Sequence, residues 1–138
     1  AWSNVLDRIV RDLVPPHEYN GDHHFHGGFV VYDFDSPSEN HNSLADGETS
    51  TLQQGSYAYA GSGNSDATPL SMEGTSVQGD SGGPTYAYLN GQWTVVGLTA
   101  HGSLNANYGD VAFNTLVSSH TDWICTFNSQ VSPILGCN

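Results

Sequence analysis

Two strand-like segments on either side of Asn90-Gly91 restrict the fold of this chain more than any other feature. TYAYL (85–89) and QWTVVGLTA (92–100) are rich in the aromatic and β-branched residues that favour strands. Asn-Gly is the preferred residue pair of the two-residue type I′ turn, which joins antiparallel strands. The sequence therefore predicts a β-hairpin over residues 85–100.

Further segments of strand composition are separated by polar or glycine-rich turns, as in antiparallel all-β domains. These segments are FVVYDF (29–34), QGSYAYAGSG (54–63) and DVAFNTLV (110–117), and a polar loop is expected over 38–51. Residues 3–14 fit either a helix or a strand that ends at the following prolines. We expect one all-β domain over residues 1–138, folded as an antiparallel β-barrel or a sandwich.

The last expected element is a short helix. The segment SSHTDWICTF (118–127) places Trp123, Ile124 and Phe127 on one side, behind Ser118 or Ser119 as the capping residue. Cys125, which lies within this segment, and Cys137 are expected to form a disulfide that closes the tail over 125–138, with two buried thiols as the alternative.

Charge restricts the partners of the chain. Arg8 and Arg11 are the only basic residues beside fourteen carboxylates, which gives a formal net charge of -12. Such a surface repels nucleic acids and anionic membranes. No apolar run approaches the roughly 18 residues that a membrane span needs. The sequence predicts a secreted protein that binds no nucleic acid and has no membrane span.

Ser81 lies in the glycine-rich sequence GDSGGP, residues 79–84. In acyl transfer a serine oxygen attacks a carbonyl carbon, and preorganised backbone N–H groups stabilise the oxyanion that forms. Glycines let a tight turn direct such groups to one side, because a positive φ costs them little. The turn therefore predicts a nucleophilic serine.

GDSGGP resembles the nucleophile motif of the trypsin/chymotrypsin-like serine peptidases, and two later segments resemble that family in the same order. VVGLTAHG (95–102) is similar to the strand that lines the specificity pocket, and YGDVAFNTLVSSHTDWI (108–124) to the last strand and C-terminal helix. The resemblance implies a reduced second, C-terminal barrel over 38–124, preceded by the end of the first barrel and the crossover over 1–37.

The resemblance also implies roles for individual residues. Ser81 would be the nucleophile, with its own N–H and that of Gly79 as the oxyanion hole, and the motif would be supported by Asp80, Gly82 and Gly83. The substrate pocket would consist of Thr75, Ser76, Ala100, His101, Gly102 and Ala112. Such a pocket has no carboxylate on its floor, so it suits a small or medium neutral side chain, and His101 leaves a preference for Glu open.

The histidine and aspartate of the family's triad are not recognisable. Gly28 occupies the position of the aspartate, and no alanine-alanine-histidine-cysteine-like motif is present. An imidazole near its ordinary pKa accepts a serine proton, so the possible substitute bases are His23, His24 and His26, oriented by Asp22, Asp33 or Asp35. Otherwise the base is supplied by a companion chain that carries the rest of the peptidase fold.

Two functions remain open at this point. The first is a secreted serine endopeptidase that acts on polypeptide substrates and needs no cofactor. The second is a non-catalytic peptidase-like domain that binds other proteins or self-associates through open strand edges. Weaker alternatives are a Zn²⁺ or Cu²⁺ site at Asp22, His23, His24 and His26, and a Ca²⁺ site at Asp33, Asp35 and Glu39.

Overall fold

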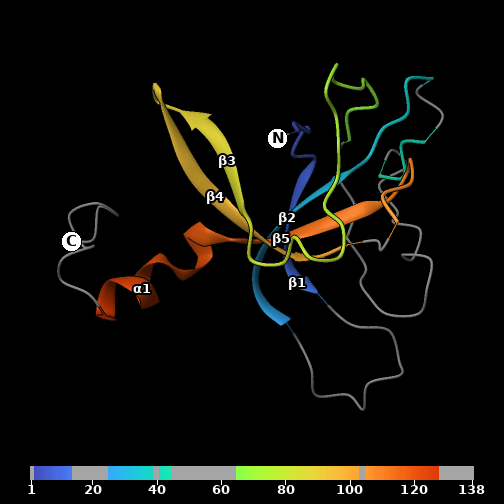
Figure 1. The fold of residues 1–138 in the computed structure, drawn as a ribbon. Coiled ribbons are helices and arrows are strands. Elements are labelled where there is room, and N and C mark those ends of the chain that lie inside the picture. Colours follow the sequence, from blue (N-terminus) through green and yellow to red (C-terminus); the bar gives the residue numbers. More distant parts are fainter. Residues whose placement is uncertain (1, 14–24, 39–40, 45–64, 103–104, 128–138) are drawn as a thin grey trace, which may run out of the picture.

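Five antiparallel strands form one open sheet in the part of the chain that the computed structural model describes, residues 2–13, 25–38, 41–44, 65–102 and 105–127. The strands are β1 (Arg8–Leu13), β2 (Phe25–Asp33), β3 (Pro84–Leu89), β4 (Gln92–His101) and β5 (Val111–Leu116). Their order across the sheet is β1-β2-β5-β4-β3 (Figure 1). The expected all-β class is therefore confirmed.

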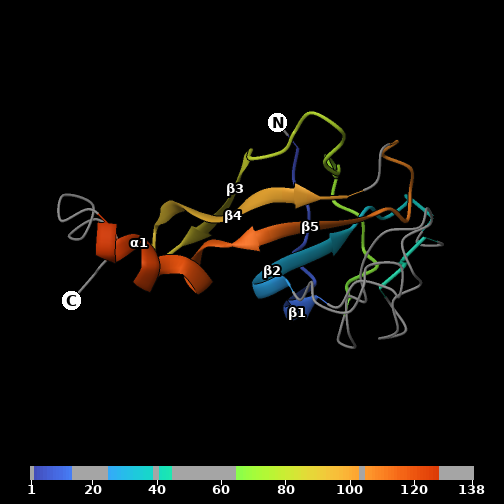
Figure 2. The same ribbon diagram turned by 90° about the horizontal axis from the view of Figure 1, so that it is seen from below.

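Two short helical segments follow the last strand, η1 (Val117–His120) and α1 (Thr121–Phe127). They lie at one end of the sheet, opposite the end where the described loops gather (Figure 2). The predicted C-terminal helix is confirmed, but its predicted cap is wrong. Leu116 precedes η1 without a side-chain capping bond, and the Ser119 hydroxyl instead accepts a hydrogen bond from the N–H of Gly28 at 3.0 Å.

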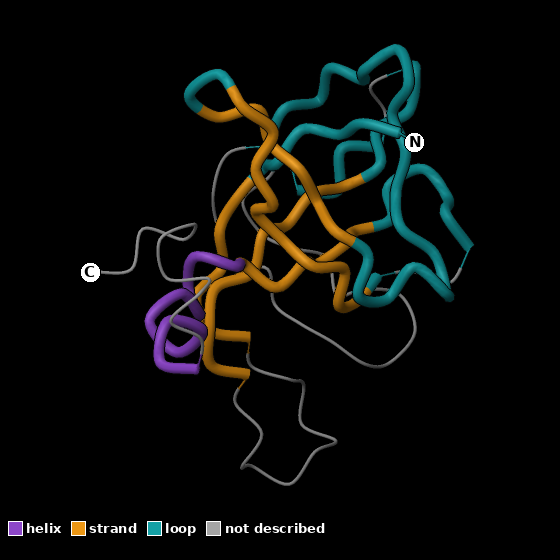
Figure 3. The backbone as a smooth tube through the Cα atoms, turned by 60° about the vertical axis from the view of Figure 1, so that its left-hand side comes forward, coloured by secondary structure: helices purple, strands orange, loops and turns teal. Residues whose placement is uncertain are grey.

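The β3–β4 hairpin confirms the prediction from Asn90-Gly91. Asn90 and Gly91 have φ values of 50° and 86°, as a type I′ turn requires at both central positions. The hairpin extends away from the other strands (Figures 1 and 3). Residues 8–13 form a strand, which resolves the ambiguity of that segment, and the strand expected over 54–63 lies outside the described residues.

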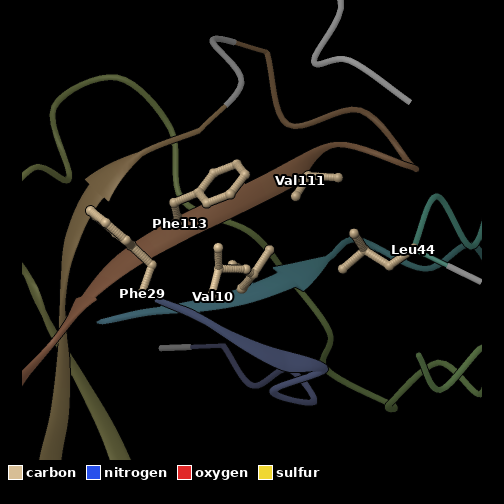
Figure 4. Packing of buried hydrophobic residues seen from close by; sticks show 6 residues of the cluster. Val10, Phe29, Leu44, Val111 and Phe113 are labelled. Atoms are coloured by element: carbon tan, nitrogen blue, oxygen red, sulfur yellow. The ribbon is translucent and has the colours of Figure 1, made fainter. Parts of the chain in front are cut away.

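The centre of the sheet is the pairing of β2 with β5, which is buried on both faces. Val31 lies opposite Phe113 and Tyr32 opposite Ala112, so alternate residues divide between the two faces. One face carries the apolar core, which consists of Val10, Phe29, Val31, Leu44, Val111 and Phe113 (Figure 4). The other face carries Tyr32 and Ala112, both of which are almost completely buried.

Leu44 closes the apolar core and is held by its backbone. Its side chain is fully buried, its carbonyl accepts a hydrogen bond from the guanidinium of Arg8, and its N–H donates to the Asp33 carboxylate at 3.0 Å. A buried backbone group needs such a partner. Arg8 and Asp33, from adjacent strands, therefore fix a loop residue that the strands alone would not place.

Carboxylates on other loops also accept hydrogen bonds from backbone N–H groups. These bonds run from Asp33 and Asp66 to Asp7, from Asp35 and Leu70 to Glu73, and from Asn107 to Asp110. Because the chain has only two basic residues, most carboxylates can have no cationic partner. Backbone N–H groups take that place in the described loops.

Among the carboxylates that the structure describes, Asp33 has the most strongly shifted pKa. Burial raises the pKa of Asp33 from 3.8 to about 7; the Leu44 N–H lowers it, while the charges of Asp7 and Asp35 and a hydrogen bond with Asp7 raise it further. The proton is therefore bound more tightly in the folded state than in the unfolded state. The stabilisation from this group is fully present below about pH 4 and is lost as the pH rises toward 7.

We predict that Asp33→Asn changes how stability depends on pH. Asparagine keeps an oxygen for the Leu44 N–H but cannot ionise. As the pH rises from 4.5 to 7.5, the free energy of unfolding of the variant should therefore increase relative to that of wild type. The gain should be a few kcal/mol at most, because one pKa unit corresponds to about 1.4 kcal/mol. Urea unfolding at both pH values measures it.

Asp66→Asn is the control for this prediction. Backbone and side-chain hydrogen bonds from Thr68 lower the pKa of the exposed Asp66, so the stabilisation from this group is already present above about pH 4, and the effect of this variant relative to wild type should be nearly the same at pH 4.5 and 7.5. An Asp33→Asn effect of equal size at both pH values would show that Asp33 does not titrate in this range.

Candidate active site

The GDSGGP segment forms a tight turn that is organised by Asp80. Its carboxylate accepts a hydrogen bond from the N–H of Val77 at 2.9 Å, and its own N–H donates to the Val77 carbonyl at 3.1 Å. Gly79 and Gly82 have φ values of 107° and 80°, a region that residues with a Cβ rarely adopt. The predicted role of Asp80 and the glycines in shaping the turn is consistent with this geometry.

The turn is also fixed to β4. The N–H of Gly82 donates to the Thr99 carbonyl at 2.8 Å, and the N–H of Thr99 donates to the Gly83 carbonyl at 2.9 Å. The register between β4 and β5 shifts next to this point, between Thr99 and His101. Such irregularities are common beside functional sites. The backbone that follows Ser81 is therefore held by β4, an inner strand of the sheet.

Ser81 is exposed at this turn. Within the described ranges, its hydroxyl makes no hydrogen bond, and the N–H groups of Gly79 and Ser81 donate none. These two N–H groups are the predicted oxyanion donors, and they are available to an incoming acceptor. No described histidine is hydrogen-bonded to Ser81, so the base is not identified among these residues.

The proposed substitute bases cannot be placed. His23 and His24 lie outside the described residues. His26 is in β2, where its backbone pairs with Asp12, and its side chain is not among those described. The hypothesis of a substitute base in this loop therefore stays a prediction.

Three of the predicted pocket residues, Ser76, Gly102 and Ala112, lie close together. A Cβ at Gly102 would lie 3.4 Å from the Ser76 hydroxyl oxygen and 3.6 Å from the Cβ of Ala112. Thr75 and Ser76 are buried, as is Ala112, whereas Ala100 is exposed. The segment before the turn, the end of β4 and β5 thus meet at one place, and the substrate pocket itself stays a prediction.

Tyr32 lies next to Ser76 and Ala112, and the sequence did not indicate it as a residue of this region. It is 1% exposed, and it lies opposite the small residue Ala112. Burial raises the pKa of its hydroxyl, which nearby Ser76 and Asn114 partly oppose, although neither meets full hydrogen-bond geometry. The Tyr-Ala pair across β2 and β5 was the available signal, and it required knowledge of the strand register.

His101 lies half-buried at the end of β4, with its ring centroid 6.1 Å from that of Phe113. Burial lowers the pKa of the His101 imidazole, so the neutral form is favoured near neutral pH. A neutral imidazole attracts a carboxylate less than a charged one does. This favours a neutral side chain over Glu as the group that the predicted pocket accepts.

Gly28 does not offer room for a side chain. A Cβ at this position would lie 2.3 Å from the Ser119 hydroxyl oxygen and 2.8 Å from a methyl carbon of Leu116. Close packing of β2 against the start of η1 explains the glycine. Gly28 lies in β2. In the strand order, β5 and β4 lie between β2 and β3, the strand that begins at the end of the GDSGGP turn.

We predict that Gly28→Ala destabilises the fold, by about 1–3 kcal/mol as is usual for overpacking. The methyl group would displace Ser119 and break its hydrogen bond with the Gly28 N–H. Chemical denaturation measures the change. In the Ser119→Ala background the same substitution should cost less, and equal costs in the two backgrounds would rule out this contact as the cause.

We predict that Asp80→Ala loosens the turn while Asp80→Asn largely preserves it. Alanine removes the acceptor of the Val77 N–H, whereas asparagine retains one. Hydrogen exchange at the Val77 amide should become faster in the alanine variant. Unchanged protection at Val77 in Asp80→Ala would contradict the role assigned to this carboxylate.

The predicted metal sites find no support in the described part of the chain, where no group of three metal-ligating side chains is present. The Asp22–His26 segment lies mostly outside it, and so does Glu39. Asp33 and Asp35 make the contacts described above. Cys125 lies in α1 and Cys137 lies outside the described residues, so the predicted disulfide stays a prediction.

No protein-family model and no curated protein sequence matches this chain. Among the described residues, none of the helices has the length and apolar character to cross a membrane. The functional argument therefore depends on the turn at Ser81 and on the residues behind it.

Proposed function

We propose that this chain is the nucleophile-bearing part of a secreted serine peptidase of the trypsin/chymotrypsin-like type, with a reduced second barrel. One observation carries the proposal: a turn fixed to β4 exposes Ser81 beside two N–H groups that make no hydrogen bond within the described residues. The grouping of Ser76, Gly102 and Ala112 behind that turn supports it.

In the proposed reaction the Ser81 oxygen attacks the carbonyl carbon of a peptide bond. A histidine on another segment or on a companion chain takes the serine proton and passes it to the leaving amine. The N–H groups of Gly79 and Ser81 stabilise the oxyanion. Water then hydrolyses the acyl-enzyme, which releases the acid and restores the serine.

The proposal predicts that a fluorophosphonate probe labels Ser81 in native material that contains every associated chain. A base next to the hydroxyl is needed for this reaction, because an unactivated serine is a weak nucleophile. Mass spectrometry of the labelled peptide locates the adduct. Labelling should disappear in Ser81→Ala and persist in Ser71→Ala, which removes another exposed serine of a turn.

A non-catalytic peptidase-like domain for extracellular binding is the second candidate. It is favoured by the lack of a hydrogen-bond partner for the Ser81 hydroxyl in the described ranges. Complete absence of labelling at Ser81 in the same material would reject the peptidase and support this candidate.

A further inference from the structure

The outer edge of β3 is open. β3 is the last strand in the sheet order, and β4 is its only strand neighbour within the described residues. Natural edge strands are usually protected by charged residues, proline or bulges. Here Pro84 and a register shift at Thr85/Tyr86 protect only the beginning of the strand, and residues 84–100 include no charged side chain.

One face of the same hairpin is apolar and exposed. Tyr86 lies opposite Val95 and Tyr88 opposite Trp93, with the Tyr88 and Trp93 ring centroids 5.3 Å apart. Trp93 is 70% exposed and Tyr88 is 61% exposed. We call Tyr86, Tyr88, Trp93 and Val95 the hairpin strip. Its two tyrosines are on the edge strand β3, and Trp93 and Val95 are on the neighbouring strand β4.

The register also determines which backbone groups face outward. Leu89 and Gln92 flank the two-residue turn, so they form a hydrogen-bonded pair. Because such pairs alternate with non-hydrogen-bonded pairs along an antiparallel ladder, the N–H and C=O groups of Tyr88 point to the open edge. These are the groups that an added strand uses.

We propose that this edge and the hairpin strip bind a basic polypeptide segment in extended conformation, which adds a strand to β3. Alternate apolar side chains of that segment would lie on the hairpin strip. A net charge of -12 repels a second copy of the chain and attracts a basic partner. This proposal goes beyond the proposed peptidase activity and does not require Ser81 to react.

The test is titration of the full chain with a dye-labelled peptide of ten residues that alternates valine and lysine, followed by fluorescence anisotropy. Tyr88→Thr and Trp93→Thr together should weaken binding at least tenfold. Tyr88→Pro, which also removes an outward N–H group, should weaken it more than Tyr88→Thr does. Met72→Thr is the matched control, because Met72 is 65% exposed and lies outside the hairpin.

The remaining arms separate the alternatives. Circular dichroism checks that each variant is folded. If Tyr88→Pro does not fold, the threonine variants still test the proposal, because they remove the side chains and keep the backbone N–H groups. A peptide that alternates valine and glutamate should bind at least tenfold more weakly. Equal binding of the two peptides, or an equal loss in Met72→Thr, would overturn the proposal.

Self-association is the other result that would overturn it. Dimerisation of the chain alone at micromolar concentration, abolished by Tyr88→Pro, would identify a second copy as the occupant of the edge. Ser81→Ala should bind the basic peptide as wild type does, so the outcome is independent of labelling at Ser81.

Discussion

The scarcity of positive charge is the constraint on which the described loops depend. With fourteen carboxylates and two basic side chains, ion pairs cannot satisfy most of the acidic groups. Backbone N–H groups do so instead, and these bonds hold loop residues in place: Asp80 holds the turn that carries Ser81, and Asp33 holds Leu44. Acidity, which is usually treated as a property of the surface, is here part of how the loops are built.

The pairing of β2 with β5 connects these loops to the candidate site. Its two faces are both buried, but they have different contents. One face holds the apolar core and Leu44, and the other holds Tyr32 and Ala112, next to Ser76 and Gly102. A change in the register of these two strands would exchange the faces, so core packing and the geometry behind Ser81 depend on the same pairing.

Features encoded by neighbouring residues could be predicted from the sequence. Asn90-Gly91 determines its own turn, and the strands at 84–89, 92–101 and 111–116 follow from composition. The cap of the C-terminal helix was predicted wrongly because the hydroxyl of Ser119 is occupied by the N–H of Gly28, a residue distant in sequence.

The candidate site was predictable to a similar extent. The turn with an exposed Ser81 follows from glycines and an aspartate that are adjacent in sequence. The place of Tyr32 and the elevated pKa of Asp33 do not, since both arise from burial by residues on other strands and loops. Whether a base lies within hydrogen-bond distance of the Ser81 hydroxyl depends on how distant segments fold together, which composition does not encode.

The charge balance also determines how the fold responds to salt. In most proteins added salt weakens favourable ion pairs and unfavourable repulsions together. Here the hydrogen bonds from N–H groups to carboxylates are short-range, whereas the repulsion among the excess carboxylates is long-range and is screened first. Moderate ionic strength should therefore favour the native state, and a dilute buffer is the harsher medium for this chain.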